Sequence, residues 1–385
     1  MVCKPGLYVA PALILLAMSP AAASTAPAPG AGPGTCTTWA RQASPNSGPG
    51  DNNLYGVTAT SASNAWAVGE FFVGTSTDTL TERWNGTSWQ KISSPGQGSG
   101  DQLNAVYALS AKDAWAVGSY SNGTTGRTLI EHWNGTTWSV VPSPNVGAGP
   151  NRLDAIRGTS ANDIWAVGNA VTAYPISKTV ILHWNGQRWR VVTSPSVAGQ
   201  PNFLTGVRPL SASQAWAVGS DGNGPAARTL ILRWTGGHWR IVSSPDIGTS
   251  GDWLNGIRVI SASDAWAVGD YYNGTADEAL YLRWNGKHWQ ALRGPSLGPG
   301  SHDLSAIGAI SARDAYAVGD SSGTTTGTSL IVHWDGKHWK AESSPSPGTS
   351  DSTLDAVYAV SPATVWAVGS YNNGGHNRTL IERCR

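Results

Sequence analysis

The chain of 385 residues has a net charge of +1, and only 13% of its residues are charged, whereas it has 47 Gly and 20 Trp. This length accommodates two ordinary domains or one large all-β domain. Lys and Arg form no basic cluster of the kind that neutralises a phosphate backbone, so we expect no nucleic-acid partner.

Residues 1–23 have the pattern of a secretory signal peptide. Lys4 supplies a positive charge, an apolar stretch runs from Leu7 to Met18, and small residues for cleavage follow. The apolar stretch is too short to span a bilayer comfortably, and no later segment is apolar enough, so we expect no membrane insertion. Residues 24–35 are rich in Pro, Gly and Ala and predict a flexible tether, followed by a secreted, extracellular domain over residues 36–385.

Seven repeats fill this domain. A segment like Ala-Trp-Ala-Val-Gly recurs at intervals of 49, 50, 51, 50, 50 and 50 residues. Its aromatic residues are Trp66, Trp115, Trp165, Trp216, Trp266, Tyr316 and Trp366. A fixed period of this length is typical of repeat architectures.

Each repeat contains four short runs typical of β-strands. The first is Leu-x-Ala/Gly-Val/Ile, the second is the Trp-Ala-Val-Gly segment, the third ends in Arg/His-Trp, and the fourth begins at another Trp. Asn-Gly or Asp-Gly joins the third and fourth runs in five repeats, which is the strongest short-range signal for a β-hairpin. The pattern predicts an all-β, seven-bladed β-propeller, because a solenoid needs shorter repeats and a sandwich is less regular.

The last repeat ends after its third run. The missing run is at the other end of the domain, where residues 36–46 match residues 135–145. We therefore expect the N-terminal strand to complete the last blade. In this alignment Cys384 takes the place of the third-run Trp and Cys36 that of the turn Gly, so a Cys36–Cys384 disulfide would replace the missing hairpin turn.

The repeats resemble those of kelch-type propellers. The hairpin Trp-Asn-Gly-Thr-Thr-Trp at residues 133–138, with the Ser-Pro that follows it, is similar to the aromatic–turn–Trp hairpin of that family. The strand Ala-Trp-Ala-Val-Gly is similar to its aromatic strand, but here a single Gly, such as Gly69, ends it. Secreted bacterial propellers with Trp-Ala-Val-Gly repeats are closest in character. A copper oxidase on a similar scaffold uses a Tyr crosslinked to Cys, and no free Cys is left here for that role.

Features that recur in every repeat belong to the scaffold. Nineteen of the 20 Trp occupy repeat positions, and only Trp253 lies off register. A basic residue precedes the Trp, or Cys384, that ends the third run of every repeat. We therefore expect this basic residue to be structural, and His132, His183 and His333 occupy this position. Three other histidines lie on separate outer hairpins, too far apart to share an ion: His238, His288 and His338. We expect no metal site and no cofactor.

Aromatic residues break the repeat pattern at the loops between the second and third runs and between repeats. These loops share one face and vary in length, and variable loops on a rigid scaffold usually bind. Tyr174 lies in the longest loop. The candidate ligand-binding aromatics are Phe71, Phe72, Tyr120, Phe203, Trp253, Tyr271, Tyr272 and Tyr371. Such side chains suit sugar rings; the alternative is that some of them only cap the core.

Three arginines also break the pattern, at one position of consecutive first runs. They are Arg157, Arg208 and Arg258. Either they converge at the channel and bind a carboxylate, sulfate or phosphate, or each packs between blades on Trp with a loop carboxylate as its partner. Of the two, the sequence favours packing between blades.

These residues predict a secreted, non-catalytic and monomeric binding propeller that holds a glycan or an extracellular protein segment on its variable-loop face. One alternative is a hydrolase or lyase acting on an anionic polysaccharide through the Arg-lined channel mouth. Acids for it would come from Glu70, Asp270 and Asp320, which share one repeat position, although the sequence shows no nucleophile, metal or phosphate motif. A third possibility is a protein-interaction scaffold at the cell surface.

Overall fold

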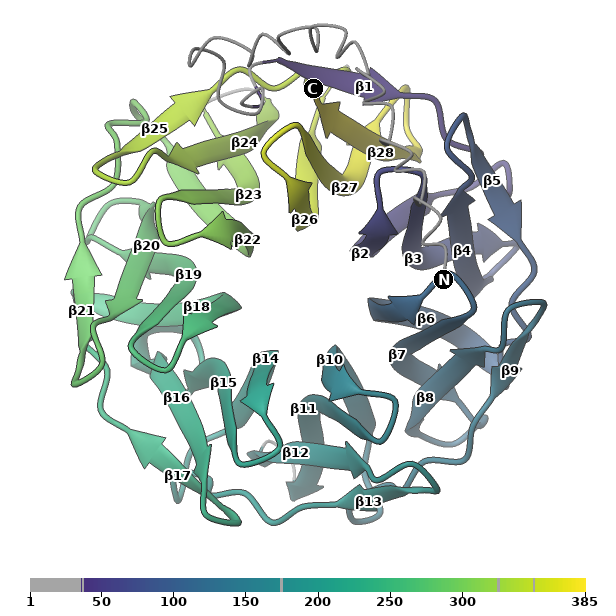
Figure 1. Cartoon of the computed structure of the whole chain (residues 1–385), viewed down its shortest axis with the longest axis horizontal. Helices are drawn as coiled ribbons and strands as arrows, with labels where there is room; N and C mark the ends of the chain where they lie inside the picture. The colour runs from purple at the N-terminus through teal and green to yellow at the C-terminus, as the bar shows by residue number, and fades with distance from the viewer. Residues whose placement is uncertain (1–35, 37, 174–175, 324–325, 349) are drawn as a thin grey trace, which may run out of the picture. The chain divides into compact units, whose positions relative to one another are not determined.

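Seven four-stranded antiparallel sheets are arranged around a central channel in the computed structural model, which describes residues 36, 38–173, 176–323, 326–348 and 350–385 (Figure 1). The signal peptide and tether predicted for residues 1–35, and Tyr174, lie outside the described residues. Blades one to six are β2–β5, β6–β9, β10–β13, β14–β17, β18–β21 and β22–β25, and blade seven combines β26–β28 with β1. The seven-bladed propeller expected from the repeats is confirmed.

Each blade uses its strands in the same order, from the channel outward. The innermost strands are β2 (Asn52–Ser61), β6 (Ser99–Ser110), β10 (Asn151–Ser160), β14 (Asn202–Ser211), β18 (Ser250–Ser261), β22 (Ser301–Ser311) and β26 (Ser352–Ser361). The second strands are β3 (Asn64–Val73), β7 (Asp113–Ser121), β11 (Asp163–Ala173), β15 (Gln214–Asp221), β19 (Asp264–Tyr272), β23 (Asp314–Ser322) and β27 (Thr364–Asn372). The third strands are β4 (Ser76–Trp84), β8 (Gly126–Trp133), β12 (Ile176–Trp184), β16 (Arg228–Thr235), β20 (Asp277–Trp284), β24 (Gly327–Trp334) and β28 (Asn377–Cys384). The outer strands are β5 (Trp89–Ile92), β9 (Trp138–Val140), β13 (Trp189–Val191), β17 (His238–Val242), β21 (Trp289–Leu292), β25 (Trp339–Glu342) and β1 (Trp39–Gln42).

Strand alternation gives the propeller two different faces. The turns between first and second strands and the Asn-Gly hairpins lie on one face, which we call the turn face. The loops between second and third strands and between blades lie on the other, the loop face. On the loop face of blade four, a short 3-10 helix, η1 (Gly224–Ala226), connects β15 to β16.

The Asn-Gly hairpins form, but not as the two-residue type I′ turn for which this dipeptide is the usual signal, because Trp133 pairs with Trp138 and Asn134 does not have a positive φ. In blade two, Gly135 has a φ of 102°, a conformation that favours glycine, and Asn134 Oδ1 accepts the backbone N–H groups of Thr136 and Thr137 at 2.9 and 3.0 Å. The Asn side chain therefore holds the turn that the following Gly makes possible.

Tryptophan side chains fill the wedges between blades. Trp66 of blade one lies with its ring centre 4.9 Å from that of Trp133 and 5.0 Å from that of Trp138, both in blade two. Trp366 of blade seven makes the same contacts with Trp84 and Trp89 of blade one, each at 5.1 Å. Trp66 and Trp366 are fully buried. The scaffold role predicted for the repeated Trp residues follows from this packing, since rings of this size dominate core energetics.

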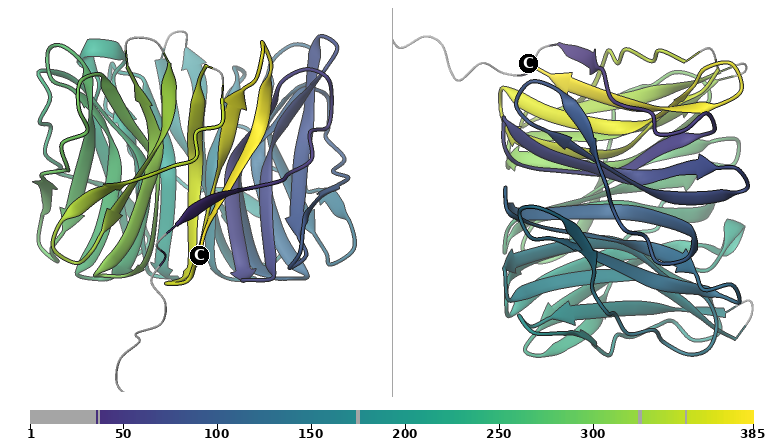
Figure 2. Two further views of the ribbon diagram at one scale, coloured as in Figure 1. Left: turned by 90° about the horizontal axis from the view of Figure 1, so that it is seen from above. Right: turned by 90° about the vertical axis from the view of Figure 1, so that its right-hand side faces the viewer.

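The N-terminal strand closes the ring as predicted. β1 pairs with β28 in antiparallel register, with Trp39 opposite Cys384, and Figure 2 shows the two strands side by side. A disulfide joins Cys36 to Cys384, whose Cα atoms are 5.4 Å apart. Trp39 Nε1 also donates to Glu342 Oε2 in blade six at 2.6 Å. The closing strand is therefore fixed to both of its neighbours.

Polar side chains at the start of each inner strand hold the loops between blades. Asn202 Oδ1 accepts the Val197 backbone N–H at 2.7 Å, and its Nδ2 donates to the Gln200 carbonyl at 2.7 Å. Asn151 makes the equivalent pair of bonds in blade three, and Asp252 accepts two backbone N–H groups in blade five. These buried residues give long loops a defined path to the channel.

Candidate functional site

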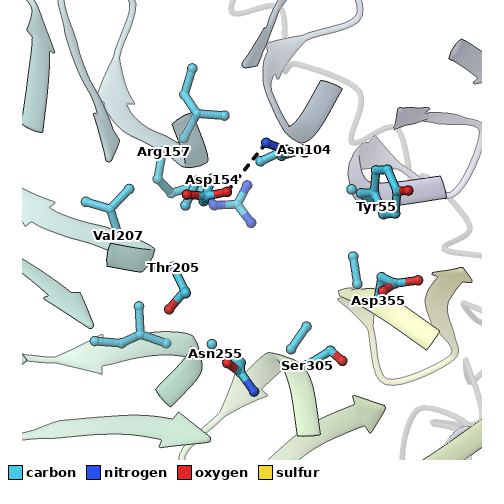
Figure 3. A pocket seen from close by; sticks show the side chains of 18 of the residues that line it. Tyr55, Asn104, Asp154, Arg157, Thr205, Val207, Asn255, Ser305 and Asp355 are labelled. Atoms are coloured by element: carbon cyan, nitrogen blue, oxygen red, sulfur yellow. Dashed lines mark hydrogen bonds between the residues drawn. The ribbon is translucent and has the colours of Figure 1, made fainter. Parts of the chain in front are cut away.

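A β-bulge in every inner strand points one side chain into the channel. The strand register shifts between Leu54 and Gly56 in blade one and at the same place in the other six blades. The bulge residues are Tyr55, Asn104, Asp154, Thr205, Asn255, Ser305 and Asp355, and Figure 3 shows them around the channel. Sequence reasoning missed this ring. A sign of it in the sequence is that the residue at position x of the Leu-x-Ala/Gly-Val/Ile run differs between repeats, whereas its neighbours are shared.

Three of the bulge side chains connect neighbouring blades. Asn104 Nδ2 donates to the Leu153 carbonyl at 2.7 Å, and Thr205 Oγ1 donates to the Leu254 carbonyl at 2.6 Å. Asn255 Nδ2 donates to the carbonyl of Leu304 at 3.0 Å. Since these bonds already satisfy the side chains structurally, the candidates for binding are the other bulge residues and their neighbours.

An aromatic hollow opens beside the channel on the loop face. It has a volume of about 450 Å³ and is lined by Phe203 and Trp253 together with Arg152, Asp154 and Asn169. Arg152 pairs with Asp154. A wider hollow of about 520 Å³ at the channel mouth shares Arg152 and Asp154. Of the aromatic candidates, Phe203 and Trp253 are the two that the structure brings to this mouth.

Local backbone explains the position of Trp253. The preceding Gly251 has a φ of 69°, and a Cβ atom at that position would collide with the Trp253 indole. Asp252 N donates to the Ala227 carbonyl at 3.1 Å, which ties this segment to the loop that contains η1. Glycine therefore gives the indole its room over the hollow.

Four carboxylates form an acidic sector at the same mouth, in blades five to seven. Burial and the charge of Asp303 raise the pKa of Asp270 to about 7, and burial and the charge of Asp320 raise that of Asp303 to about 6. Burial and Asp320 raise the pKa of Asp355 to about 7. Asp303 Oδ1 is buried without a hydrogen-bond partner. Clustered carboxylates with raised pKa values favour a bound cation or shared protons.

The aromatic hollow and the acidic sector adjoin each other. Trp253 on β18 is the cross-strand neighbour of Asp270 on β19, and Asn255 Nδ2 donates to Asp270 Oδ1 at 3.0 Å. The mouth is thus aromatic in blades four and five and acidic in blades five to seven.

The remaining aromatic candidates lie elsewhere on the blades. Phe71 and Tyr371 are buried, with Lys91 Nζ 4.1 Å from the Phe71 ring centre and Arg41 Cζ 4.3 Å from that of Tyr371. The other four are half-buried and line neither hollow: Phe72, Tyr120, Tyr271 and Tyr272. Tyr120 and Tyr271 pack against core clusters. Several of these residues therefore cover the core, which is the alternative to ligand binding that the sequence left open.

The three arginines of the first runs lie in the channel. They do not lie between the Trp rings of neighbouring blades, which is the alternative that the sequence favours. Arg157 and Arg208 line a channel cavity of about 150 Å³ together with the bulge residues, and Figure 3 shows Arg157 reaching into it. Arg258 is not part of that lining. Because each follows its blade's bulge by three residues, the arginines lie deeper than the loop-face mouth, toward the turn face.

Histidines that precede the third-run Trp pair with aspartates of their own blades. His132 Nε2 lies 2.9 Å from Asp113 Oδ1, and His183 Nε2 lies 2.7 Å from Asp163 Oδ1. In the described part of the chain, no group of three or more His, Cys, Asp or Glu residues is arranged to hold a metal ion. No helix among the described residues is long and apolar enough to cross a membrane.

Comparisons with known proteins show the fold alone. No family profile matches the chain, and no curated protein matches it. Among solved structures, YCF48 bound to D1 peptide is similar with a TM-score of 0.55 and 14% identity, over 92% of this chain and 98% of that one. A protein of unknown function from Dyadobacter fermentans DSM 18053 is similar with a TM-score of 0.50 and 12% identity, over 73% of this chain and 93% of that one. The kelch-type character of the repeats stays a prediction.

Proposed function

We propose that this chain is an extracellular, non-catalytic binding propeller that holds an extended protein segment across its loop-face mouth. The segment places an apolar or aromatic side chain in the aromatic hollow and a basic side chain in the acidic sector. One observation carries the proposal: Trp253, the off-register Trp, lines a hollow and lies beside Asp270 of the acidic sector.

Charge and burial at the mouth support a cationic ligand. Asp270, Asp303 and Asp355 have raised pKa values because of burial and of neighbouring carboxylates. A Lys or Arg side chain placed among them would favour their ionised forms and form charge-assisted hydrogen bonds. Phe203 and Trp253 supply the large, rigid aromatic area that is frequent at binding hot spots.

Two further observations agree with an extracellular peptide-binding role. The similar propeller YCF48 was solved with a peptide bound, so this scaffold can present a peptide site. The Cys36–Cys384 disulfide is of the kind that persists in oxidising compartments, as extracellular location requires.

Peptides selected from a displayed random library against the full chain should be enriched in a basic residue near an aromatic or aliphatic one. Trp253→Ala should weaken their binding at least about tenfold, because truncating a buried aromatic anchor removes 2 kcal/mol or so. Phe72→Ala, a change in an aromatic residue of the same face that lines neither hollow, should leave the affinity unchanged. Calorimetric titration measures all three affinities.

The pH dependence and a glycan array complete this test. Binding should strengthen as pH rises from 5 to 8, since the carboxylates of Asp270 and Asp355 ionise near pH 7. Oligosaccharide binding that depends on Trp253, without peptide affinity, would show a glycan-binding propeller instead. Affinity that is indifferent to Trp253→Ala would exclude the hollow as the site.

A second candidate is the hydrolase or lyase acting on an anionic polysaccharide. The observation in its favour is that Arg157 and Arg208 line the same cavity as Asp154 and Asp355. Burial and the charge of Asp320 raise the pKa of Asp355 to about 7, a value suited to a general acid. Turnover of uronate- or sialate-containing polymers, lost in Arg208→Gln, would establish it, and no turnover on a broad panel would reject it.

A further inference from the structure

Five side chains from five inner strands meet around the deeper part of the channel. Arg157 of blade three lies with its Cζ 5.4 Å from the ring centre of Tyr107 in blade two and 5.2 Å from that of Tyr358 in blade seven. Arg208 and Arg258 follow at the same position of blades four and five. Arg157 therefore contacts the adjacent blade two and also blade seven, which is not adjacent to blade three, and a residue confined between two neighbouring blades cannot do this.

No acidic partner is found for these arginines among the described residues, in contrast to Arg283 and Arg152. Arg283 Nε lies 2.9 Å from Asp264 Oδ1, and Arg152 pairs with Asp154, the acid nearest to Arg157 on its own strand. No described hydrogen bond or ion pair neutralises the trio, and Nε of Arg208 and of Arg258 is buried without a partner. A buried polar group without a partner is costly, so each such group needs an explanation.

The electrostatics agree with this geometry. Burial, and then the charges of Arg157 and Arg258, lower the pKa of Arg208 well below its usual range. Burial and the charge of Arg157 also lower the pKa of Arg258. Three guanidinium groups thus repel one another in a partly desolvated space, and an anion between them would remove that repulsion.

We propose that Arg157, Arg208 and Arg258 form a binding site inside the channel for a single oxyanionic group, namely a carboxylate, a sulfate or a phosphate. The planar guanidinium groups would bind its oxygens, and the hydroxyl groups of Tyr107 and Tyr358 are further donors beside them. The adjoining cavity of about 150 Å³ is large enough for a small anion with a few waters.

The site differs from the proposed peptide site in depth and in sign of charge. Asp355 of the acidic sector lines the loop-face end of the cavity that Arg157 and Arg208 also line, and the arginines lie three residues further along the inner strands than the bulge residues. Since the peptide test depends on Trp253 and the anion test on Arg208, the two proposals fail separately.

Calorimetric titration of the full chain with sodium sulfate, sodium acetate and sodium D-glucuronate tests the site, with D-glucose as the uncharged control and chloride holding the ionic strength constant. We expect saturable binding of at least one anion and none of D-glucose. Arg208→Gln and Arg157→Gln should each weaken it at least about tenfold, the effect of losing one charge-assisted hydrogen bond. Arg228→Gln is the matched control, because Arg228 is an exposed arginine of β16 that pairs with Asp246.

A stability measurement separates binding from a folding defect. In buffer with chloride but no oxyanion, Arg208→Gln should raise the thermal midpoint, because it removes one of three repelling charges, and added sulfate should no longer stabilise the variant. Preference for sulfate would identify a free inorganic ion as the ligand. Tighter binding of glucuronate than of acetate would identify a uronate sugar. Both results support the site. Wild-type protein without saturable binding, or an equal loss in Arg228→Gln, would overturn it.

Discussion

Replacing Cys36 and Cys384 together by serine lowers the free energy of unfolding by up to about 5 kcal/mol, the value expected when a cross-link closes nearly the whole chain. The two residues are 348 positions apart, and the bond holds β1 against β28, which no hairpin turn connects. Without it, β1 retains four paired residues, the contact of Arg41 with Tyr371 in blade seven and the hydrogen bond of Trp39 to blade six. Chemical denaturation of the wild type and of the double variant gives the difference directly.

Reduction of the wild type provides the control. Reduced wild-type protein should match the double serine variant in stability, and the variant should not respond to the reductant. Equal stabilities of oxidised and reduced wild type would mean that hydrogen bonding and Trp packing alone close the ring.

Stability falls as pH rises from about 4.5 to 7, because three glutamates are fully buried in the third strands of blades seven, one and two. Burial raises the pKa of Glu131 and of Glu382 to about 7 from the ordinary 4.5, and it raises that of Glu82 well above its usual range. The folded protein therefore holds protons that the unfolded chain releases. From the two pKa values, each of Glu131 and Glu382 costs roughly 3 kcal/mol above pH 7 and nothing below pH 4.5.

Glutamine substitutions isolate the effect. The double variant Glu131→Gln, Glu382→Gln should lose the part of this slope that the two residues contribute, because the amides keep the shape of the carboxyl groups without titrating; Glu82 and the carboxylates of the acidic sector, whose pKa values are also raised, retain the rest. Gly96 N donates to Glu131 at 3.2 Å and Ser344 to Glu382 at 2.9 Å, and an amide oxygen can accept the same bonds. Urea unfolding at pH 5 and pH 8 supplies the comparison, and identical slopes in variant and wild type would contradict the assignment.

The ring, the blade boundaries and its closure were predictable because they repeat. A period near 50 residues, the Asn-Gly turns and the shared Trp positions each imply the same four strands. The closure needed only the match between residues 36–46 and 135–145, which the pairing of Trp39 with Cys384 confirms.

The site was less predictable because it depends on departures from regular strands. A bulge moves one side chain out of the strand alternation, and nothing in the alternation of Leu-x-Ala/Gly-Val/Ile shows that x turns into the channel. Asp355 was therefore missed, although it lies at the same position as Tyr55 and Asp154. The buried Glu82 was missed for another reason: its strand neighbours are polar, and only comparison with Leu182 and Leu232 at the same position reveals an apolar site.

The position of the three arginines in the repeats was not enough to predict where their side chains lie. Their shared place in three inner strands left two alternatives open, the channel or the space between blades. Arg157 lies against Tyr358 of blade seven, a contact that requires the ring to be closed. No repeat considered by itself contains that information.

The pairing of β1 with β28 also has a consequence for the order of folding. Synthesis proceeds from the N-terminus, so β1 emerges first and its partner emerges last. Six blades can assemble from neighbours in sequence, each hairpin forming as soon as it is complete. The seventh waits for an encounter between distant ends, the slowest kind of contact to form. Until then β26–β28 present an unpaired edge and blade one an uncovered Trp surface, so the last step of folding is also the step at which two molecules could exchange their first strands.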